Sequence, residues 1–135
     1  MAYWLIKSEP GTYSIDQMKK DKQTFWSGVR NYQARNNLRA MKKGDLCLFY
    51  HSVTAPSVVG LVEVVKEAYQ DPTTEEIAWV AVDVLYKETF KNPITLETVK
   101  QTKALAEMAL LKSSRLSVQP VKREEFELIV AMAKQ

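Results

Sequence analysis

Hydrophobic residues in this chain recur with two different spacings, one typical of strands and one typical of helices. Short runs rich in aromatic and β-branched residues predict strands at residues 3–7, 46–51, 58–69, 77–90 and 116–120. The run at 46–51 is apolar on both alternating faces until its end, as expected of a strand covered on both sides. The turn signal Gln70-Asp71-Pro72 joins the two longest runs, so we expect an antiparallel hairpin whose second arm ends at Pro93.

Two helices are predicted before the second strand. Residues 31–43 form the longer one, with Asn31 as its N-cap, Gly44 beyond its end, and one apolar face made by Ala34, Leu38 and Met41. Ser14 and Gln17 have the spacing of a capping box, which predicts a shorter helix to about residue 20. The polar stretch 21–24 then leads into a turn that contains Trp26.

Three more helices are predicted after the hairpin, at residues 95–102, 105–111 and 123–134. The last is the clearest, because one of its faces collects Phe126, Ile129, Val130 and Ala133. We expect this face to cover a barrel opening or one side of a sheet. Strands that follow one another with short helices between them, without strict βαβ alternation, favour an α+β fold. The sequence therefore predicts a small mixed β-barrel with peripheral short helices and a C-terminal amphipathic helix.

Composition narrows this picture only slightly. The chain has 135 residues, 46% of them hydrophobic, which fits a single domain over residues 1–135. Its net charge of +3 permits a polyanionic partner without requiring one. Cys47 is the single cysteine, and the N-terminal residues lack the pattern of a signal peptide, so we expect a cytoplasmic protein. No apolar run is long enough to cross a bilayer, and we expect a monomer with no membrane partner.

Several kinds of catalytic chemistry are disfavoured. One histidine and one cysteine cannot supply the ligand set of a zinc or iron site. Cys47 and His51 lie four positions apart on a predicted strand, roughly 13 Å at 3.3 Å per residue, which is beyond hydrogen-bond reach. The four glycines have neither dinucleotide-binding nor P-loop spacing. We therefore expect no metal, no cofactor and no catalytic residue.

Trp26 is the leading candidate for ligand binding. It lies in a Phe-Trp-Ser-Gly turn directly before a helix that carries arginine and asparagine side chains. A large ring held beside a helix start is a suitable stacking platform for a flat polar ligand, while the alternative is a tryptophan buried in the core. Trp79, on the second arm of the hairpin, is expected to be a packing residue.

Polar residues at predicted strand ends and helix starts could converge around such a ligand. They are Ser8, Trp26, Asn31, Tyr50, His51, Ser52, Arg115 and Ser117. Single-stranded and flipped bases are held in this way, by an aromatic face and by hydrogen bonds to the base edge. Candidate phosphate contacts are Arg30, Arg35, Arg39, Lys42 and Lys43. A charge run is more often a solvated helix face, so Arg30 and Arg115, which lie in loops, are the stronger candidates.

Four ordered motifs resemble the EVE domain family and together cover essentially the whole chain. They are WLIKSEP at 4–10, WSGVRNYQARNNLRAMKKGD at 26–45, FYHS at 49–52 and RLSVQP at 115–120. The resemblance implies a PUA-like fold, a twisted β-barrel with peripheral helices related to YTH and ASCH domains. It also implies a reader of modified nucleobases in DNA or RNA.

The resemblance assigns roles to individual residues as well. By similarity to YTH domains, Trp26 is a stacking wall, Ser27 offers backbone groups to the base edge and Ser8 lines the floor. The EVE motifs add Arg30 and Asn31, Tyr50 to Ser52, and Arg115 with Ser117 as cleft positions. A second cage tryptophan has no obvious counterpart, since Tyr69 is the only aromatic residue between Glu67 and Ile77.

The function we expect is non-enzymatic binding of an extruded or single-stranded modified base, with 5-substituted pyrimidines as ligands by family analogy. The alternatives are an enzyme or accessory subunit of RNA modification and a small-metabolite sensor. Turnover of a nucleoside or modified RNA would favour the enzyme. Binding of mononucleosides without gain from flanking phosphates would favour the sensor.

Overall fold

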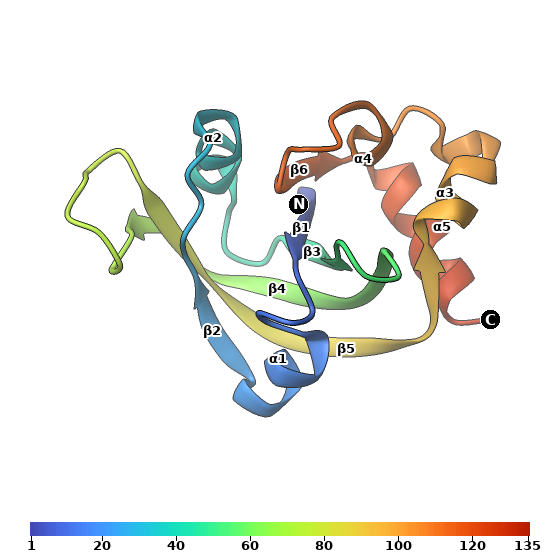
Figure 1. Cartoon of the computed structure of the whole chain (residues 1–135), viewed down its shortest axis with the longest axis horizontal. Helices are drawn as coiled ribbons and strands as arrows, with labels where there is room; N and C mark the ends of the chain where they lie inside the picture. Colours follow the sequence, from blue (N-terminus) through green and yellow to red (C-terminus); the bar gives the residue numbers. More distant parts are fainter.

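The computed structural model describes residues 1–135 and is organised around one mixed sheet (Figure 1). Its strands are β1 (Tyr3–Ser8), β2 (Gln23–Trp26), β3 (Leu46–His51), β4 (Ser57–Gln70), β5 (Val80–Thr95) and β6 (Val118–Val121). Their order is β2-β5-β4-β3-β1-β6, with β1 and β3 parallel and every other neighbouring pair antiparallel. β2 and β6 are the two edges and do not pair with each other, so the sheet is open and does not close into the predicted barrel. The α+β class with a mixed sheet is confirmed.

Helices cover both faces of this sheet. They are α1 (Ile15–Asp21), α2 (Tyr32–Ala40), α3 (Leu96–Gln101), α4 (Ala109–Lys112) and α5 (Arg123–Ala133), with a 3₁₀ turn at Lys103–Leu105. Along β3, Cys47 and Phe49 belong to the core under α1 and α2, whereas Leu48 and Tyr50 belong to the core under α3, α4 and α5. Because both sides of β3 are buried, consecutive residues of this strand are apolar. None of the helices is long and apolar enough to cross a membrane.

Local capping signals are confirmed. The Asn31 Oδ1 atom accepts a hydrogen bond from the backbone N–H of Ala34 at 2.9 Å, and Ser14 Oγ accepts one from Gln17 N at 3.1 Å. The Gln17 side chain does not complete a capping box, because its amide donates to Asp21 instead. Both helices begin where the sequence places them, since an N-cap satisfies backbone donors that the helix leaves free.

Several predicted boundaries are wrong. The helix predicted at 31–43 ends at Ala40, and the strand predicted from residue 77 begins at Val80, so Trp79 lies just before the second arm of the hairpin and not on it. Residues 23–26 are a strand, and their polar character is compatible with an edge position, where one side of the strand faces solvent. Pro93 does not end β5, because the register shifts between Thr89 and Ile94 and leaves proline outside the regular ladder. In place of the single helix predicted at 105–111, the structure has the 3₁₀ turn and α4. Apolar residues three positions apart share a face in a 3₁₀ helix as well as in an α-helix, so their spacing does not distinguish the two.

Gly60 brings α1 close to the sheet. A Cβ atom at this position would lie 2.6 Å from Ile15 Cδ1 and 2.7 Å from the Glu88 carbonyl oxygen. Both distances are too short for any side chain, so glycine permits the contact. The close approach fixes α1, and the loop that precedes it, against β4 and β5.

Candidate functional site

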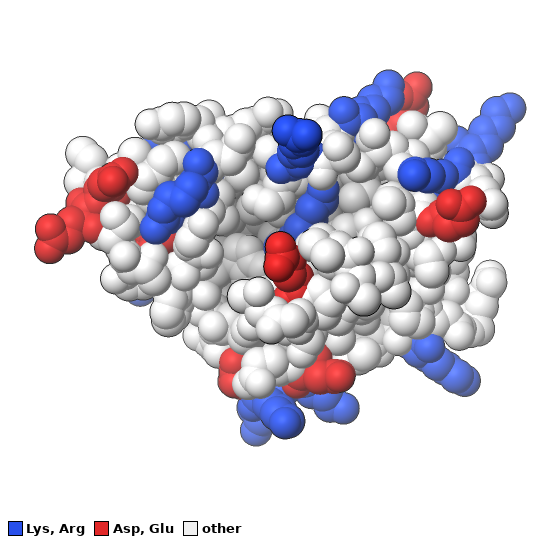
Figure 2. Space-filling model, in the orientation of Figure 1, with Lys and Arg blue, Asp and Glu red and all other residues white.

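A cavity of about 600 Å³ opens where β1 and β2 end. Its lining residues are Lys7, Ser8, Glu9, Thr12, Tyr13, Thr24, Phe25, Trp26, Ser27, Gly28, Val29, Arg30 and Ser117. Figure 2 shows a hollow near the middle of one face, with basic side chains on two of its sides and an acidic side chain at its rim. The volume lies in the range of small-molecule sites and is sufficient for a nucleoside. We call it the Trp26 cavity.

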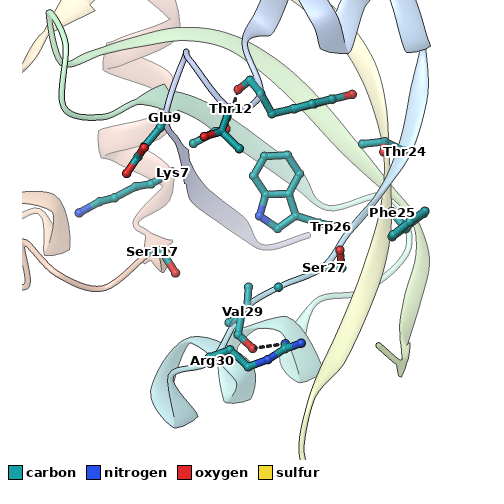
Figure 3. Close-up of a pocket in the computed structure, with 13 residues that line it drawn as sticks. Lys7, Glu9, Thr12, Thr24, Phe25, Trp26, Ser27, Val29, Arg30 and Ser117 are labelled. Carbon is teal, nitrogen blue, oxygen red and sulfur yellow. Dashed lines mark hydrogen bonds between the residues drawn. The ribbon is translucent and has the colours of Figure 1, made fainter. Parts of the chain in front are cut away.

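The Trp26 ring is held in place but not covered. It meets Phe49 edge to face, with ring centroids 5.5 Å apart and planes at 81°, and Tyr13 at 6.1 Å and 78°. The rest of the half-buried ring faces the cavity, while Phe25 points away on the other side of the strand (Figure 3). Perpendicular contacts with these two rings hold Trp26 in place while part of its aromatic surface stays accessible.

The other two tryptophans differ from Trp26. Trp4 is buried and its Nε1–H donates to Asp45 at 3.0 Å. Trp79 is buried too, and its Nε1–H donates to Glu76 at 2.9 Å. The Trp26 Nε1–H donates to no protein group, so this indole alone has both a free ring surface and a free donor.

Asp71 anchors the loop that follows Trp26. Its carboxylate is completely buried and accepts hydrogen bonds from Gly28 N at 2.9 Å, Arg30 Nη1 at 3.0 Å and Thr73 N at 2.7 Å. Burial alone would raise the pKa of Asp71, but the bonds from Thr73, Gly28 and Arg30 outweigh it and lower the pKa to about 2. Gly28 adopts φ +78°, a conformation that favours glycine. The cavity wall from Ser27 to Arg30 therefore depends on a carboxylate outside the cavity.

The structure brings half of the predicted site residues to the Trp26 cavity. Ser8, Trp26, Ser27, Arg30 and Ser117 all line it. The Ser8 hydroxyl donates to the Tyr13 carbonyl oxygen at 2.6 Å, which ties the end of β1 to the loop before α1. Lys7 N donates to the Ser117 carbonyl oxygen at 2.9 Å, so β1 also positions the Ser117 wall.

Asn31 and Arg115 lie in a second hollow of about 310 Å³, together with Gln33, Ser113, Ser114 and Leu116. Chain neighbours line both spaces, since Arg30 and Ser117 face the Trp26 cavity while Asn31 and Leu116 face the second hollow. The two therefore lie side by side. We call the second one the Arg115 hollow.

Three predicted residues line neither space. Tyr50 is buried in the core on the α5 side of the sheet. His51 Nε2 accepts a hydrogen bond from Ile15 N at 3.0 Å, and Ser52 N donates to the Ser8 carbonyl oxygen at 2.9 Å. Burial lowers the pKa of His51, although Asp16 opposes the shift, and the Nε2 acceptor fits a neutral ring. These residues support the walls of the site from behind.

The predicted phosphate contacts are also outside both spaces, except Arg30. Arg30 is paired with Asp71, and the Arg35 guanidinium donates to the Ala78 carbonyl oxygen at 3.1 Å. Arg39 is exposed on the same helix. Lys42 and Lys43 are exposed in the turn before β3.

Lys7 and Tyr13 line the cavity but were not predicted. Lys7 Nζ donates to the Ser114 carbonyl oxygen at 2.7 Å, and burial lowers the pKa of this lysine. The Tyr13 hydroxyl donates to Asp21 at 2.7 Å, and burial, followed by this carboxylate, raises the pKa of Tyr13 to about 12. The position of Lys7 beside Ser8, at the end of the first predicted strand, is a signal that could have identified it.

Aromatic residues do not enclose the cavity as a parallel cage. Tyr13 is nearly perpendicular to Trp26, and Trp79 lines neither space. Trp79 instead packs against Tyr32, with ring centroids 4.9 Å apart, and lies 5.6 Å from the Arg30 guanidinium. This contact agrees with the packing role expected of Trp79. The cavity is an open platform with one broad aromatic wall.

The single thiol is inaccessible. Cys47 is completely buried, and burial followed by the nearby Asp45 charge raises the pKa of this thiol. The His51 acceptor nitrogen is occupied by Ile15 N. No group of three or more His, Cys, Asp and Glu side chains is placed to hold a metal ion.

An open mixed sheet with helices on both faces and a hollow beside a fixed tryptophan defines a PUA-like, YTH-like α+β fold. The YTH domain of Zygosaccharomyces rouxii MRB1 shares this fold, with 14% identity and a TM-score of 0.63 over 99% of this chain and 87% of that one. The EVE domain model matches residues 2–132, and the chain belongs to the EVE domain family.

Several relatives are similar along nearly the whole chain. Mouse thymocyte nuclear protein 1 is 42% identical over 96% of this chain and 73% of its own length. The NMR structure of Rpa0253 from Rhodopseudomonas palustris has 44% identity and a TM-score of 0.94, covering 98% of this chain and 93% of that one. Human THYN1 protein, solved in complex with 5-methylcytosine containing DNA, has 37% identity and a TM-score of 0.91, covering 100% and 99%.

The predicted cytoplasmic location is contradicted by these relatives. The chicken, mouse and human proteins are named thymocyte nuclear protein 1. A single cysteine and a missing signal peptide indicate a reducing compartment, and the nucleus is as reducing as the cytosol. The sequence features used for the prediction therefore do not distinguish a nuclear protein from a cytoplasmic one.

Proposed function

We propose that this protein is a non-enzymatic module that binds nucleic acid carrying a modified base, and that the base enters the Trp26 cavity from a flipped or single-stranded nucleotide. The observation that carries the proposal is the half-exposed Trp26 ring, which two perpendicular aromatic contacts hold in place while it lines a cavity of about 600 Å³. The complex of human THYN1 protein with 5-methylcytosine containing DNA supports a 5-substituted pyrimidine as the base.

Base recognition divides between stacking and hydrogen bonding. Trp26 stacks on the base, which contributes about 1 to 3 kcal/mol per base. The free Trp26 Nε1–H, the backbone groups of Ser27 and the Ser117 hydroxyl bond to the base edge, since all three residues line the cavity. Ser8 forms the floor. We propose a monomeric module in which residues 1–135 form one domain, since the EVE domain model matches residues 2–132.

Trp26→Ala tests the proposal. Fluorescence anisotropy compares a labelled DNA strand that carries one 5-methylcytosine with the same strand carrying cytosine. We expect the wild type to prefer the modified strand and the variant to lose about five- to 150-fold in affinity, which corresponds to 1 to 3 kcal/mol of stacking.

Two further variants control for the fold. Trp26→Phe keeps an aromatic face, so part of the preference should survive, and Trp79→Phe changes a tryptophan outside both spaces and should leave the preference intact. Circular dichroism checks that each variant is folded. A folded Trp26→Ala protein that retains the preference of the wild type would refute the pocket.

A further inference from the structure

Arginines near the Trp26 cavity differ in whether their charge is already used. The Arg30 guanidinium is paired with the buried Asp71 carboxylate at 3.0 Å and also donates to Thr73 Oγ1 at 3.2 Å. The Arg35 guanidinium donates to the Ala78 carbonyl oxygen and to Asn36. Arg115 is exposed and forms no ion pair with any carboxylate of the chain. Arg115 therefore has its donors free for a ligand.

The charge around the two spaces is uneven. Glu9 lies on the rim of the Trp26 cavity and is the only acidic residue that lines either space. The Arg115 hollow has no acidic lining residue, and its other lining groups are the amides of Asn31 and Gln33, two serines and Leu116. If the backbone of a bound nucleotide runs out of the Trp26 cavity past Glu9, its phosphate is repelled by the carboxylate. If the backbone runs toward Arg115, its phosphate is attracted by the guanidinium.

Lys7 marks the boundary between the two spaces. Its side chain lines the Trp26 cavity, while its ammonium donates at 2.7 Å to the carbonyl oxygen of Ser114, which lines the Arg115 hollow. An ammonium has three donors, so two of them remain available beyond this bond. Lys7 and Arg115 thus place two positive charges along the route from one space to the other.

We propose that the Arg115 hollow is a phosphate subsite, which takes the phosphodiester group adjacent to the nucleotide held in the Trp26 cavity. Arg115 is the main contact, with donors that can form a paired interaction with phosphate oxygens, and Lys7 supports it at the boundary. This inference depends on the proposed function, because it assumes that a nucleotide occupies the Trp26 cavity. It also moves the predicted phosphate contact away from the exposed face of α2.

The chain offers a matched control in Arg39. Like Arg115, Arg39 is exposed and forms no ion pair. Asn37 faces β6 and donates to the Val118 carbonyl oxygen at 2.7 Å, and two residues turn a helix by about 200°. Arg39 therefore lies on the opposite side of α2 from β6. Arg115→Ala and Arg39→Ala remove the same charge at different places.

Three probes separate the phosphate from the base. They are the nucleoside 5-methyl-2′-deoxycytidine, a single-stranded DNA trinucleotide with that nucleoside at its centre, and the same trinucleotide with uncharged methylphosphonate linkages. For Arg115→Ala we expect about a tenfold loss of affinity for the charged trinucleotide, because charge-assisted hydrogen bonds are the strong ones. The slope of log affinity against log salt should shrink by about 0.7, the value for one phosphate of a single strand.

The other combinations of variant and probe should show little change in affinity. Arg115→Ala should leave the affinity for the nucleoside and for the uncharged trinucleotide unchanged, and Arg39→Ala should leave all three unchanged. An unaltered salt slope in Arg115→Ala, or an equal loss in Arg39→Ala, would overturn the subsite. Equal binding of modified and unmodified bases by the wild type would instead refute the proposed function, independently of the Arg115 result.

Discussion

Comparison of the two faces of the sheet shows how one core is sealed while the other is left partly open. Under α3, α4 and α5, side chains such as Leu105, Met108 and Ile129 are almost completely buried, and mainly apolar contact closes this side. On the α1 and α2 side, Trp26 remains half exposed at the edge of the core. The wall beside it is held by hydrogen bonds to the buried carboxylate of Asp71. A cavity in a small protein thus requires polar contacts where apolar packing is interrupted.

The sealed side should account for stability and not for ligand choice. Ile129→Ala removes a completely buried side chain and should lower the free energy of unfolding by about 2 to 5 kcal/mol. Chemical denaturation measures this loss. The affinity of the folded variant for a 5-methylcytosine strand should equal that of the wild type, and an altered base preference would show that the two faces are not independent.

Asp71→Asn should affect both stability and binding, because Asp71 holds the cavity wall. The carboxylate has a pKa of about 2 in the folded protein and an ordinary value near 3.8. A lowered pKa stabilises the fold fully above pH 4, and this contribution is lost as the pH falls from about 4 to 2. A shift of this size corresponds to about 2 kcal/mol.

Denaturation of the wild type and of Asp71→Asn at pH 7 and at pH 2 to 3 measures this contribution. The variant should be less stable at pH 7, should lose less stability on acidification, and should bind the modified strand more weakly. Glu63→Gln is the control, because the ion pair of Glu63 with Lys87 is partly exposed and worth little. Equal pH profiles for the wild type and Asp71→Asn would contradict the role of Asp71.

His51→Leu should have a smaller effect, about 1 kcal/mol, since leucine has no acceptor for the backbone N–H of Ile15 at the start of α1. Burial lowers the pKa of His51 below its ordinary value of 6.5. The neutral ring therefore contributes stability above pH 6.5, and the contribution is lost as the pH falls through the lowered pKa. Thermal unfolding between pH 8 and pH 5 should show a weaker pH dependence in the variant, and an unchanged dependence would contradict a neutral His51.

The smallest effect is expected for Lys42→Ala combined with Lys43→Ala. Both side chains are exposed outside the Trp26 cavity and the Arg115 hollow. Exposed charges at a distance are largely screened at physiological salt, so affinity for the modified strand should change by less than about twofold. Anisotropy titration checks this, and a loss comparable with that of Arg115→Ala would place the phosphate path along α2.

The features that the sequence predicts correctly are those determined by contacts between residues close in the chain. The caps at Ser14 and Asn31 depend on residues three positions away, and both helices begin as predicted. The edge strand β2 was missed, because its polar residues are explained only by its pairing with β5. Asp71 was read as a turn residue, and its bond to Thr73 is local, but its bonds to Gly28 and Arg30 join positions more than forty residues apart.

The candidate site follows the same division. Trp26 and Ser27 are consecutive, and the motif places them together without knowledge of the fold. Tyr50, His51 and Ser52 lie at a strand end as predicted, but Tyr50 is buried in the core, the α1 N-terminus bonds to His51 Nε2, and Ser8 bonds to the Ser52 backbone N–H. Which groups at a strand end stay free depends on the neighbouring segments, and a single sequence does not contain that information. The likeness to the EVE family supplied the fold and the ligand class.

The central claim is that Trp26 alone among the three tryptophans meets the base. A two-dimensional ¹H–¹⁵N NMR spectrum resolves one indole N–H signal per tryptophan, and single Trp→Phe variants assign them. Titration with a DNA strand carrying one 5-methylcytosine should shift the Trp26 signal, while the signals of Trp4 and Trp79, bonded to Asp45 and Glu76, should stay in place. A stationary Trp26 signal at saturating DNA would contradict the account.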